Sequence, residues 1–249
     1  MPNTRKKRAD TLLVEHGLAE TRARAQAMIM AGLVFCGDKR IDKAGENLPE
    51  DARLEIRGED HPWVSRGGVK LAHAIEQFGF DIADAVCLDI GASTGGFTDV
   101  LLHNGAARVY AVDVGQGQLA WKLRQDERVI VLESTNARYL RPEHIPEPVD
   151  FITCDVSFIG LEKVLPAPMA LTHPGSGLIA LIKPQFQAGR EKVGKGGIVT
   201  DPAVHDEVCV NMSQWLNAQP GWRVTGLTES PVQGAKGNRE FLIAAVRDE

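Results

Sequence analysis

The chain has 249 residues, of which 43% are hydrophobic and 24% charged, as is typical of a folded globular protein. No apolar run approaches the ~18 residues of a transmembrane helix, and the basic start "MPNTRKKRAD" lacks the apolar segment of a secretory signal. The net charge of −5 is spread unevenly, because residues 1–45 carry +4 and the remainder carries −9. A basic head on an acidic body is typical of a nucleic-acid-binding module attached to a second domain.

The four cysteines, Cys36, Cys87, Cys154 and Cys209, are widely spaced and form neither a C-x-x-C pair nor a cluster with histidine. This spacing predicts reduced thiols in a cytoplasmic protein and no disulfide framework. It also predicts no metal site.

Residues 9–57 predict a small α+β module. A first short helix is expected to end at Gly17, because glycine commonly follows the last helical turn. Thr21 can cap a second helix, which runs to about Ala31 and ends at Gly32. "LVFCGDKRI" then predicts a strand entering a turn, and "ARLEIRG" a short closing strand. The inward face of the second helix is expected to hold five apolar side chains: Ala23, Ala27, Met28, Ile29 and Met30.

The run "TRARAQAMIMAGLVFCGDKRI" resembles the helix–turn–strand core of the S4 RNA-binding domain, with Thr21 where that family usually has serine. The resemblance implies that this module holds structured RNA. The cations expected to contact RNA lie in this module, in the segment that follows it and in a later glycine-rich loop: Arg5, Lys6, Lys7, Arg22, Arg24, Lys39, Arg40, Arg66, Arg190, Lys192 and Lys195.

A change of pattern follows "GEDHPWVSRGG", which is polar, contains Pro62 and ends in two glycines. We expect a first domain over residues 1–61, a linker over 62–68 and a second domain over 69–249. In the second domain, five apolar runs alternate with helix-like stretches: "AVCLDIG", "RVYAVDVG", "RVIVLES", "VDFITCDVS" and "GLIALIKPQF". Fully apolar strands that alternate with helices predict a parallel sheet covered on both faces.

Two more runs, "GWRVTGLTES" and "REFLIAAVR", are joined by a link too short for anything but antiparallel neighbours. Seven strands that end in an antiparallel pair are typical of the Rossmann-like α/β methyltransferases. The predicted fold is therefore a seven-stranded α/β sheet of that class behind a small α+β module.

"DIGASTGGFTDVLL", residues 89–102, contains G-x-S-x-G, the turn that presents the nucleophilic serine of a hydrolase. That interpretation needs an earlier oxyanion loop and a later histidine, for which His205 in a helical segment is the only candidate we considered. The alternative is a glycine loop for a cofactor, and it predicts an acid about 20 residues later, where Asp113 stands. The spacing G-A-S-T-G-G and the acid Asp89 before it disfavour a pyrophosphate and favour a cationic cofactor, S-adenosylmethionine. The residues expected to hold it are Asp89, Gly91, Ser93, Thr94, Gly95, Gly96, Phe97, Asp113, Val114 and Asp155.

Six motifs, "SRGGVKL", "DIGASTGGFTD", "AVDVG", "DVSFI", "LIKPQFQAGR" and "NREFL", resemble the FtsJ-like RNA 2′-O-methyltransferases. Together with the S4-like module, they are similar to the TlyA family of S4-containing ribosomal RNA methyltransferases, also called haemolysin A-like. The resemblance implies a catalytic Lys-Asp-Lys-Glu tetrad at Lys70, Asp155, Lys183 and Glu240, with Lys183 as general base. It also implies a cytidine ribose of 23S rRNA as substrate, with 16S rRNA as a second candidate and ribosomal subunits as partners.

Two segments beside these motifs are rich in glycine and cations, "FQAGREKVGKGGIVTD" (186–201) and "ESPVQGAKGN" (229–238). The first predicts a mobile loop that grips a phosphate backbone, and the second is a further candidate. Other functions stay open at this point: a membrane-active haemolysin, an RNA-binding protein with an inactive enzyme domain, or methylation of another RNA, a protein or a small molecule. The oligomeric state is also open.

Overall fold

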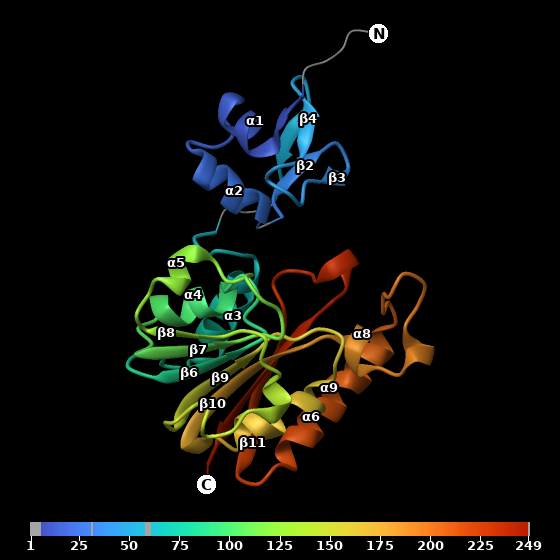
Figure 1. The fold of residues 1–249 in the computed structure, drawn as a ribbon. Helices are drawn as coiled ribbons and strands as arrows, with labels where there is room; N and C mark the ends of the chain where they lie inside the picture. Colours follow the sequence, from blue (N-terminus) through green and yellow to red (C-terminus); the bar gives the residue numbers. More distant parts are fainter. Residues whose placement is uncertain (1–5, 31, 58–60, 249) are drawn as a thin grey trace. The chain divides into compact units, whose positions relative to one another are not determined.

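The computed structural model describes residues 6–30, 32–57 and 61–248 (Figure 1). The chain divides into two compact units, Met1–Arg66 and Gly67–Glu249, and each is described by itself. The second unit begins with helix α3 (Gly67–Phe78), which includes the last two residues of the segment predicted as a linker. Among the predicted RNA contacts, Arg5 lies outside the described residues.

The N-terminal unit is the small α+β module that the sequence predicts. Its helices are α1 (Ala9–Glu15) and α2 (Arg22–Met30). A three-stranded sheet has the order β3-β2-β5, and a two-stranded sheet pairs β1 with β4. The strand bounds are β1 Lys6–Arg8, β2 Val34–Cys36, β3 Lys39–Arg40, β4 Asn47–Pro49 and β5 Leu54–Ile56.

The caps of α2 follow the sequence, whereas its buried face does not. Thr21 Oγ1 accepts a hydrogen bond from the backbone N–H of Arg24 at 3.1 Å, so it caps the helix as predicted. The predicted inward face was wrong at both of its ends, because Ala23 is exposed and Met30 is 50% exposed. The buried residues of the helix are Ala25, Met28 and Ile29.

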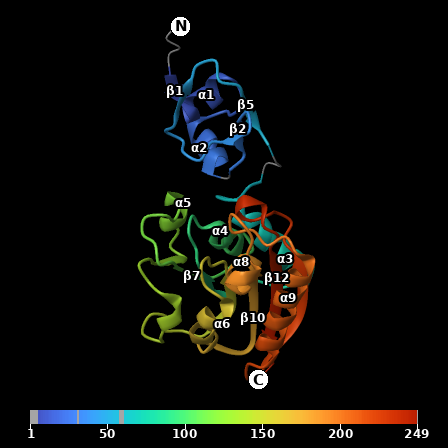
Figure 2. The same cartoon turned by 90° about the vertical axis from the view of Figure 1, so that its right-hand side faces the viewer.

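The C-terminal unit holds one seven-stranded sheet in the order β11-β12-β10-β9-β6-β7-β8 (Figures 1 and 2). Only β12 runs antiparallel to its neighbours β10 and β11. This confirms the predicted fold class. The bounds are β6 Val86–Ile90, β7 Arg108–Val112, β8 Val129–Leu132, β9 Val149–Cys154, β10 Thr172–Ile182, β11 Trp222–Glu229 and β12 Phe241–Arg247.

Helices cover both faces of this sheet, which explains why its central strands are apolar on both sides. Helix α3 packs on α4 (Gly96–His103) over one face, and α9 (Pro202–Asn217) lies on the other with α6 (Leu161–Val164). The remaining helices are short: α5 Trp121–Arg124, α7 Pro166–Met169, α8 Pro184–Gln187, and the 3-10 turns η1 Ala137–Tyr139, η2 Arg190–Lys192 and η3 Ala235–Gly237. Among the described residues, no helix has the length and apolar character that crossing a membrane requires.

The strand order places a ligand site. Strand β6 is the first of the unit, and it pairs in parallel with β7 on one side and with β9 on the other. The chain therefore leaves β6 in one direction and later returns on its opposite side. In open α/β sheets, ligands bind at the carboxyl ends of the strands where the order reverses in this way.

Candidate active site

The glycine loop after β6 is shaped by backbone constraints at two positions. Gly91 has φ +81° and lies against the carbonyl oxygen of Asp155, so a side chain at this position would collide with that backbone. Ser93 has φ +48°, which is uncommon for a residue other than glycine. Its N–H donates to Asp113 Oδ2 at 2.8 Å.

Asp113, the acid predicted after the second strand, holds this loop in place. Its Oδ1 accepts the N–H of Gly115 at 2.7 Å, while its Oδ2 accepts the N–H of Ser93. Ser93 Oγ donates to Gln118 Oε1 at 3.2 Å, and His205 bonds instead to the carbonyl of Val199 at 3.0 Å. In the described part of the chain the Ser93 hydroxyl thus bonds to Gln118 and not to His205, and the hydrolase interpretation finds no support.

A pocket of about 430 Å³ opens beside this loop at the carboxyl ends of the strands. Five of the predicted cofactor residues line it: Gly91, Ser93, Asp113, Val114 and Asp155. The other predicted residues after Ser93, namely Thr94, Gly95, Gly96 and Phe97, form the turn into α4 and its first residues and do not line the pocket. These residues connect the loop to α4.

Asp89 has a different place from the one expected. It is fully buried, and its carboxylate accepts hydrogen bonds from Thr98 Oγ1 at 2.6 Å and from Thr153 Oγ1 at 3.1 Å. Burial raises its pKa to about 6, although the two hydroxyl donors act in the opposite direction. Asp89 thus links β6, α4 and β9 beneath the loop and does not line the pocket.

Two of the four tetrad residues form an ion pair at the ends of neighbouring strands. Lys183 directly follows β10, Asp155 directly follows β9, and Lys183 Nζ lies 2.5 Å from Asp155 Oδ1. Lys183 Nζ also donates to Ser157 Oγ at 3.0 Å. The side chains of Lys183 and Asp155 are 11% and 20% exposed, so the pair is largely buried.

The other two tetrad residues form a second and more buried pair. Lys70 in the first turn of α3 donates to Glu240 Oε2 at 2.6 Å, and their side chains are 10% and 3% exposed. Glu240 directly precedes β12, whose first residue Phe241 pairs with Ile182 at the end of β10. Lys183 follows Ile182 and Glu240 precedes Phe241, so both residues lie just beyond this pair of facing residues. The two ion pairs therefore lie at the same end of the sheet.

Several residues of the pocket escaped sequence reasoning. Gln118, Thr135 and Asn136 line it from the segments after β7 and β8, and Ser157 and Phe158 from the segment after β9. The signal was present for the last two, because both belong to the motif "DVSFI". For the others, the position just after a parallel strand was the available signal.

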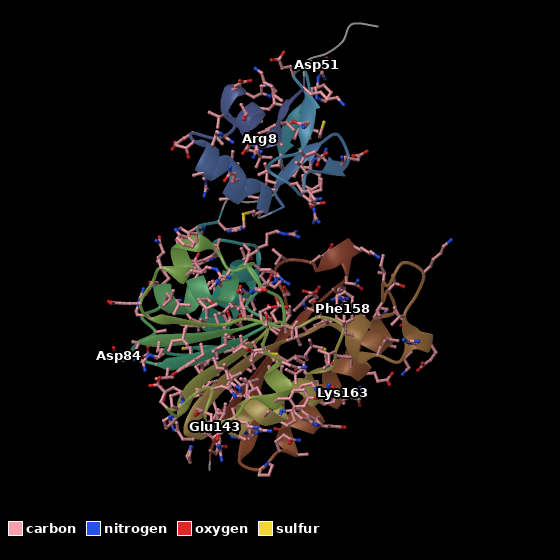
Figure 3. The ribbon with its side chains drawn as sticks, viewed as in Figure 1. Arg8, Asp51, Asp84, Glu143, Phe158 and Lys163 are labelled. Carbon is pink, nitrogen blue, oxygen red and sulfur yellow. The ribbon has the colours of Figure 1, made fainter. Side chains whose placement is uncertain are left out.

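Phe158 is the most unusual of these residues. Its side chain is 89% exposed although it is a large apolar group, and its φ is +66°, a strained conformation for a bulky residue. Phe158 is labelled in Figure 3. Its ring centroid lies 4.8 Å from that of Phe186 in α8. An aromatic face presented to solvent at the mouth of a pocket suits stacking on a planar ligand.

Five of the cations predicted to contact RNA form ion pairs with acids of their own unit. The pairs join Lys7 to Glu15 and Glu50, Arg22 to Asp10, Lys39 to Glu46, Arg40 to Asp42 and Lys192 to Glu207. Lys6, Arg190 and Lys195 are exposed, whereas Arg24 and Arg66 are half-buried. The contact of these cations with RNA stays a prediction.

One acid in the N-terminal unit organises two arginines. Asp10 is fully buried and accepts hydrogen bonds from Arg8 at 3.0 and 2.9 Å, from Arg22 at 3.1 Å and from Gln26 at 2.8 Å. The bond from Arg8, with further help from Gln26 and Arg22, holds the pKa of Asp10 well below its usual range. The side chains of Arg8 and Arg22 are about half exposed, and their bonds to the buried Asp10 fix the orientation of the guanidinium groups.

Comparisons with known proteins agree with this geometry. The model of the FtsJ-like methyltransferase family matches residues 63–247, and the model of the S4 domain matches residues 7–54. The YqxC protein of Bacillus subtilis is 52% identical over 241 residues, which are 96% of this chain and 85% of that protein. The 16S/23S rRNA (cytidine-2′-O)-methyltransferase TlyA of Mycobacterium tuberculosis is 44% identical over 240 residues, 96% of this chain and 89% of TlyA. A solved structure of a Streptococcus thermophilus protein named as a hemolysin has a TM-score of 0.76 at 44% identity and covers 99% of this chain and 90% of that one. The chain therefore belongs to the FtsJ-like methyltransferases, in the group that also carries an S4 domain and includes the TlyA proteins.

Proposed function

We propose that this protein transfers a methyl group from S-adenosylmethionine to a ribose 2′-hydroxyl of ribosomal RNA. The observation that carries the proposal is the Lys183–Asp155 ion pair, which is largely buried and adjoins the pocket through Asp155. The substrate follows from relatives: TlyA of Mycobacterium tuberculosis is named for cytidine 2′-O-methylation of 16S and 23S rRNA, and TlyA of Campylobacter jejuni for that of 23S rRNA. We accordingly assign a cytidine of 23S rRNA as target, with 16S rRNA as a second candidate.

The pocket fits the methyl donor. Its volume of about 430 Å³ lies in the range of small-molecule sites. Gly91 leaves the loop open where a side chain would collide, and the carboxylate of Asp113 suits ribose hydroxyls more than phosphates. When bound, S-adenosylmethionine supplies a methyl group made electrophilic by its sulfonium charge.

The chain's own residues would prepare the hydroxyl. Lys183 acts as the base in its neutral form: after its ammonium has released a proton to solvent, its Nζ receives the proton of the 2′-hydroxyl. Asp155 and Ser157 fix the direction of the amine through the contacts described above. Lys70, held by Glu240, faces the same end of the sheet and positions the ribose. Holding the hydroxyl in line with the donor is worth several kcal/mol by itself.

Phe158 would hold the base of the target nucleotide. A base must leave its stack before its ribose can enter a site at the strand ends, and an exposed aromatic ring compensates for part of the lost stacking. Phe158 has that exposure and lines the same pocket as Asp155. This role belongs to the same proposal as the transfer itself.

The test is methyl transfer from labelled S-adenosylmethionine to ribosomal subunits and to naked rRNA taken from cells that lack the modification. The labelled site is mapped by its resistance to alkaline cleavage, which needs a free 2′-hydroxyl. We expect label on a cytidine ribose of 23S rRNA. Label on a base, or on no rRNA although S-adenosylmethionine binds, would overturn the proposed substrate and favour another RNA. A cytoplasmic location remains a prediction.

A further inference from the structure

The two glycine-rich segments that flank the tetrad, 186–201 and 229–238, meet at Val199. This residue is buried, and its N–H donates to Asn238 Oδ1 at 3.1 Å. Its carbonyl bonds to His205 Nε2 in the first turn of α9 at 3.0 Å. Both polar groups of the Val199 backbone are therefore held by side chains from other segments, and the loop predicted as mobile is fastened at this point.

Asn238 makes a second bond that completes the attachment. Its Nδ2 donates to the carbonyl of Gly197 at 3.0 Å, so the amide pairs with one donor and one acceptor of the loop, as a neighbouring strand would. This pattern also fixes which amide atom is oxygen and which is nitrogen. At the surface, Lys236 Nζ adds a bond to the carbonyl of Gly196 at 2.7 Å. The two segments are drawn in orange and red in Figure 1.

The same asparagine shapes the site of Glu240, two residues later. The carbonyl of Asn238 accepts the N–H of Gly234 at 2.8 Å, which closes a turn over residues 234–238. Gly234 faces the carboxylate of Glu240 so closely that a side chain there would overlap it. The turn thus forms one wall of the space that holds Glu240 against Lys70.

We propose that Asn238 is a positioning residue that couples the cationic glycine loop to the tetrad. A phosphate backbone bound by the exposed Arg190 and Lys195 stabilises the loop in the position where Asn238 holds it. That position in turn keeps the 234–238 turn against Glu240, and Glu240 keeps Lys70 in place. The inference rests on the proposed function for its substrate, whereas the attachment itself does not depend on it.

The experiment compares Asn238→Ala and Asn238→Asp with the wild-type protein. Asn238→Asp keeps an acceptor for Val199 but replaces the donor to Gly197 by an anionic oxygen, so it breaks the bond to Gly197 while it leaves the bond from Val199 possible. The matched control is Asn217→Ala, which removes a similar bond, from the N–H of Val224 at 2.8 Å, at the other end of α9. The readouts are the Kd of S-adenosylmethionine, the single-turnover methylation rate at saturating rRNA, and backbone hydrogen exchange of peptides covering 194–200 and 232–240.

For both Asn238 variants we expect a single-turnover rate about 10- to 100-fold lower, because small displacements of positioning groups have effects of this size. S-adenosylmethionine affinity should stay unchanged, and both peptides should lose protection together. An unchanged rate, or a loss of S-adenosylmethionine affinity as large as the loss of rate, would show a merely structural role. If the wild-type protein labels no rRNA, the proposed function fails, and hydrogen exchange then decides the coupling. Joint loss of protection supports it, and loss in 194–200 alone overturns it.

Discussion

The two units of the protein use charge in opposite ways. In the N-terminal unit Lys39 and Arg40 form ion pairs at the surface, where their side chains are 68% and 43% exposed. In the C-terminal unit the lysines of the tetrad, Lys70 and Lys183, are only 10% and 11% exposed. Surface ion pairs are worth at most about 1 kcal/mol, so a cation can exchange its acid for a phosphate at little cost. In a buried ion pair each side chain is held in one position by its partner. A fixed position of the charged groups suits a catalytic site better than a binding surface.

The two units also differ in how they surround a buried aspartate. Asp10 and Asp89 are both fully buried, yet the pKa of Asp10 is lowered and that of Asp89 is raised. Asp10 accepts hydrogen bonds from two guanidinium groups, whereas the side-chain donors to Asp89 are the neutral hydroxyls of Thr98 and Thr153. The comparison indicates that the charge of the partners, and not burial alone, decides in which direction the pKa of a buried carboxyl shifts.

The largest expected effect comes from Lys183→Met, which removes the amine while keeping an unbranched side chain. We expect the single-turnover rate to fall by about 10²- to 10⁴-fold, the usual contribution of a general base. Rapid-quench methylation assays at saturating rRNA measure it. Lys163→Met, an exposed lysine on α6 labelled in Figure 3, is the control and should keep the wild-type rate. Equal rates for the two variants would contradict a catalytic role of the buried lysine.

Asp89→Asn tests the aspartate without a cationic partner. Its folded pKa of about 6 lies above the ordinary 3.8, so its contribution to stability is fully present below pH 3.8 and is lost as the pH rises through 6. Asparagine does not titrate. The free energy of unfolding of wild type minus variant should therefore fall by up to about 3 kcal/mol between pH 4 and pH 7. Urea unfolding followed by tryptophan fluorescence suits this unit, and a pH-independent difference would refute the assignment.

Asp10→Asn tests the aspartate with cationic partners, and the sign reverses. The lowered pKa means that its stabilisation is present above the ordinary pKa of 3.8 and is lost as the pH falls through the folded value. At pH 7 the variant should lose about 2 kcal/mol in the N-terminal unit, since bonds to a charged group are replaced by bonds to a neutral one. Hydrogen exchange of residues 9–30 measures the loss. Unchanged protection at pH 7 would show that Asp10 does not anchor Arg8 and Arg22.

The smallest effect is expected for the exposed ring of Phe158 in the C-terminal unit. Phe158→Ala should raise the KM for rRNA about tenfold through lost stacking, with little change in the Kd of S-adenosylmethionine. Steady-state methylation and calorimetric titration give the two constants. Tyr139→Ala is the matched control, because Tyr139 is also exposed (61%) but does not line the pocket. A parallel loss of S-adenosylmethionine affinity in Phe158→Ala would place the ring on the cofactor instead of on the base.

The sequence predicted the fold class because the alternation of apolar strands and helices is a strong pattern. The predicted buried face of α2 was wrong because alanine and other apolar residues occur all around this helix. The helical period of 3.6 residues therefore fits more than one choice of buried face. Asp89 was assigned to the cofactor because it stands just before the glycine loop. Its partner Thr153 is 64 residues away, and no local pattern reveals that contact. The strained backbone of Phe158 and the attachment through Asn238 also depend on tertiary contacts, which spacing alone does not show.

The central claim, that surface cations bind the RNA and buried lysines act on it, is tested most directly by one paired measurement. It compares Lys183→Met with the double variant Lys39→Ala/Arg40→Ala for rRNA affinity at several salt concentrations and for single-turnover rate at saturating rRNA. The account predicts weaker and less salt-dependent binding with an unchanged rate for the surface variant, and unchanged binding with a greatly reduced rate for Lys183→Met. A surface variant that loses rate at saturation, or a Lys183 variant that loses RNA affinity to the same extent as rate, would contradict it.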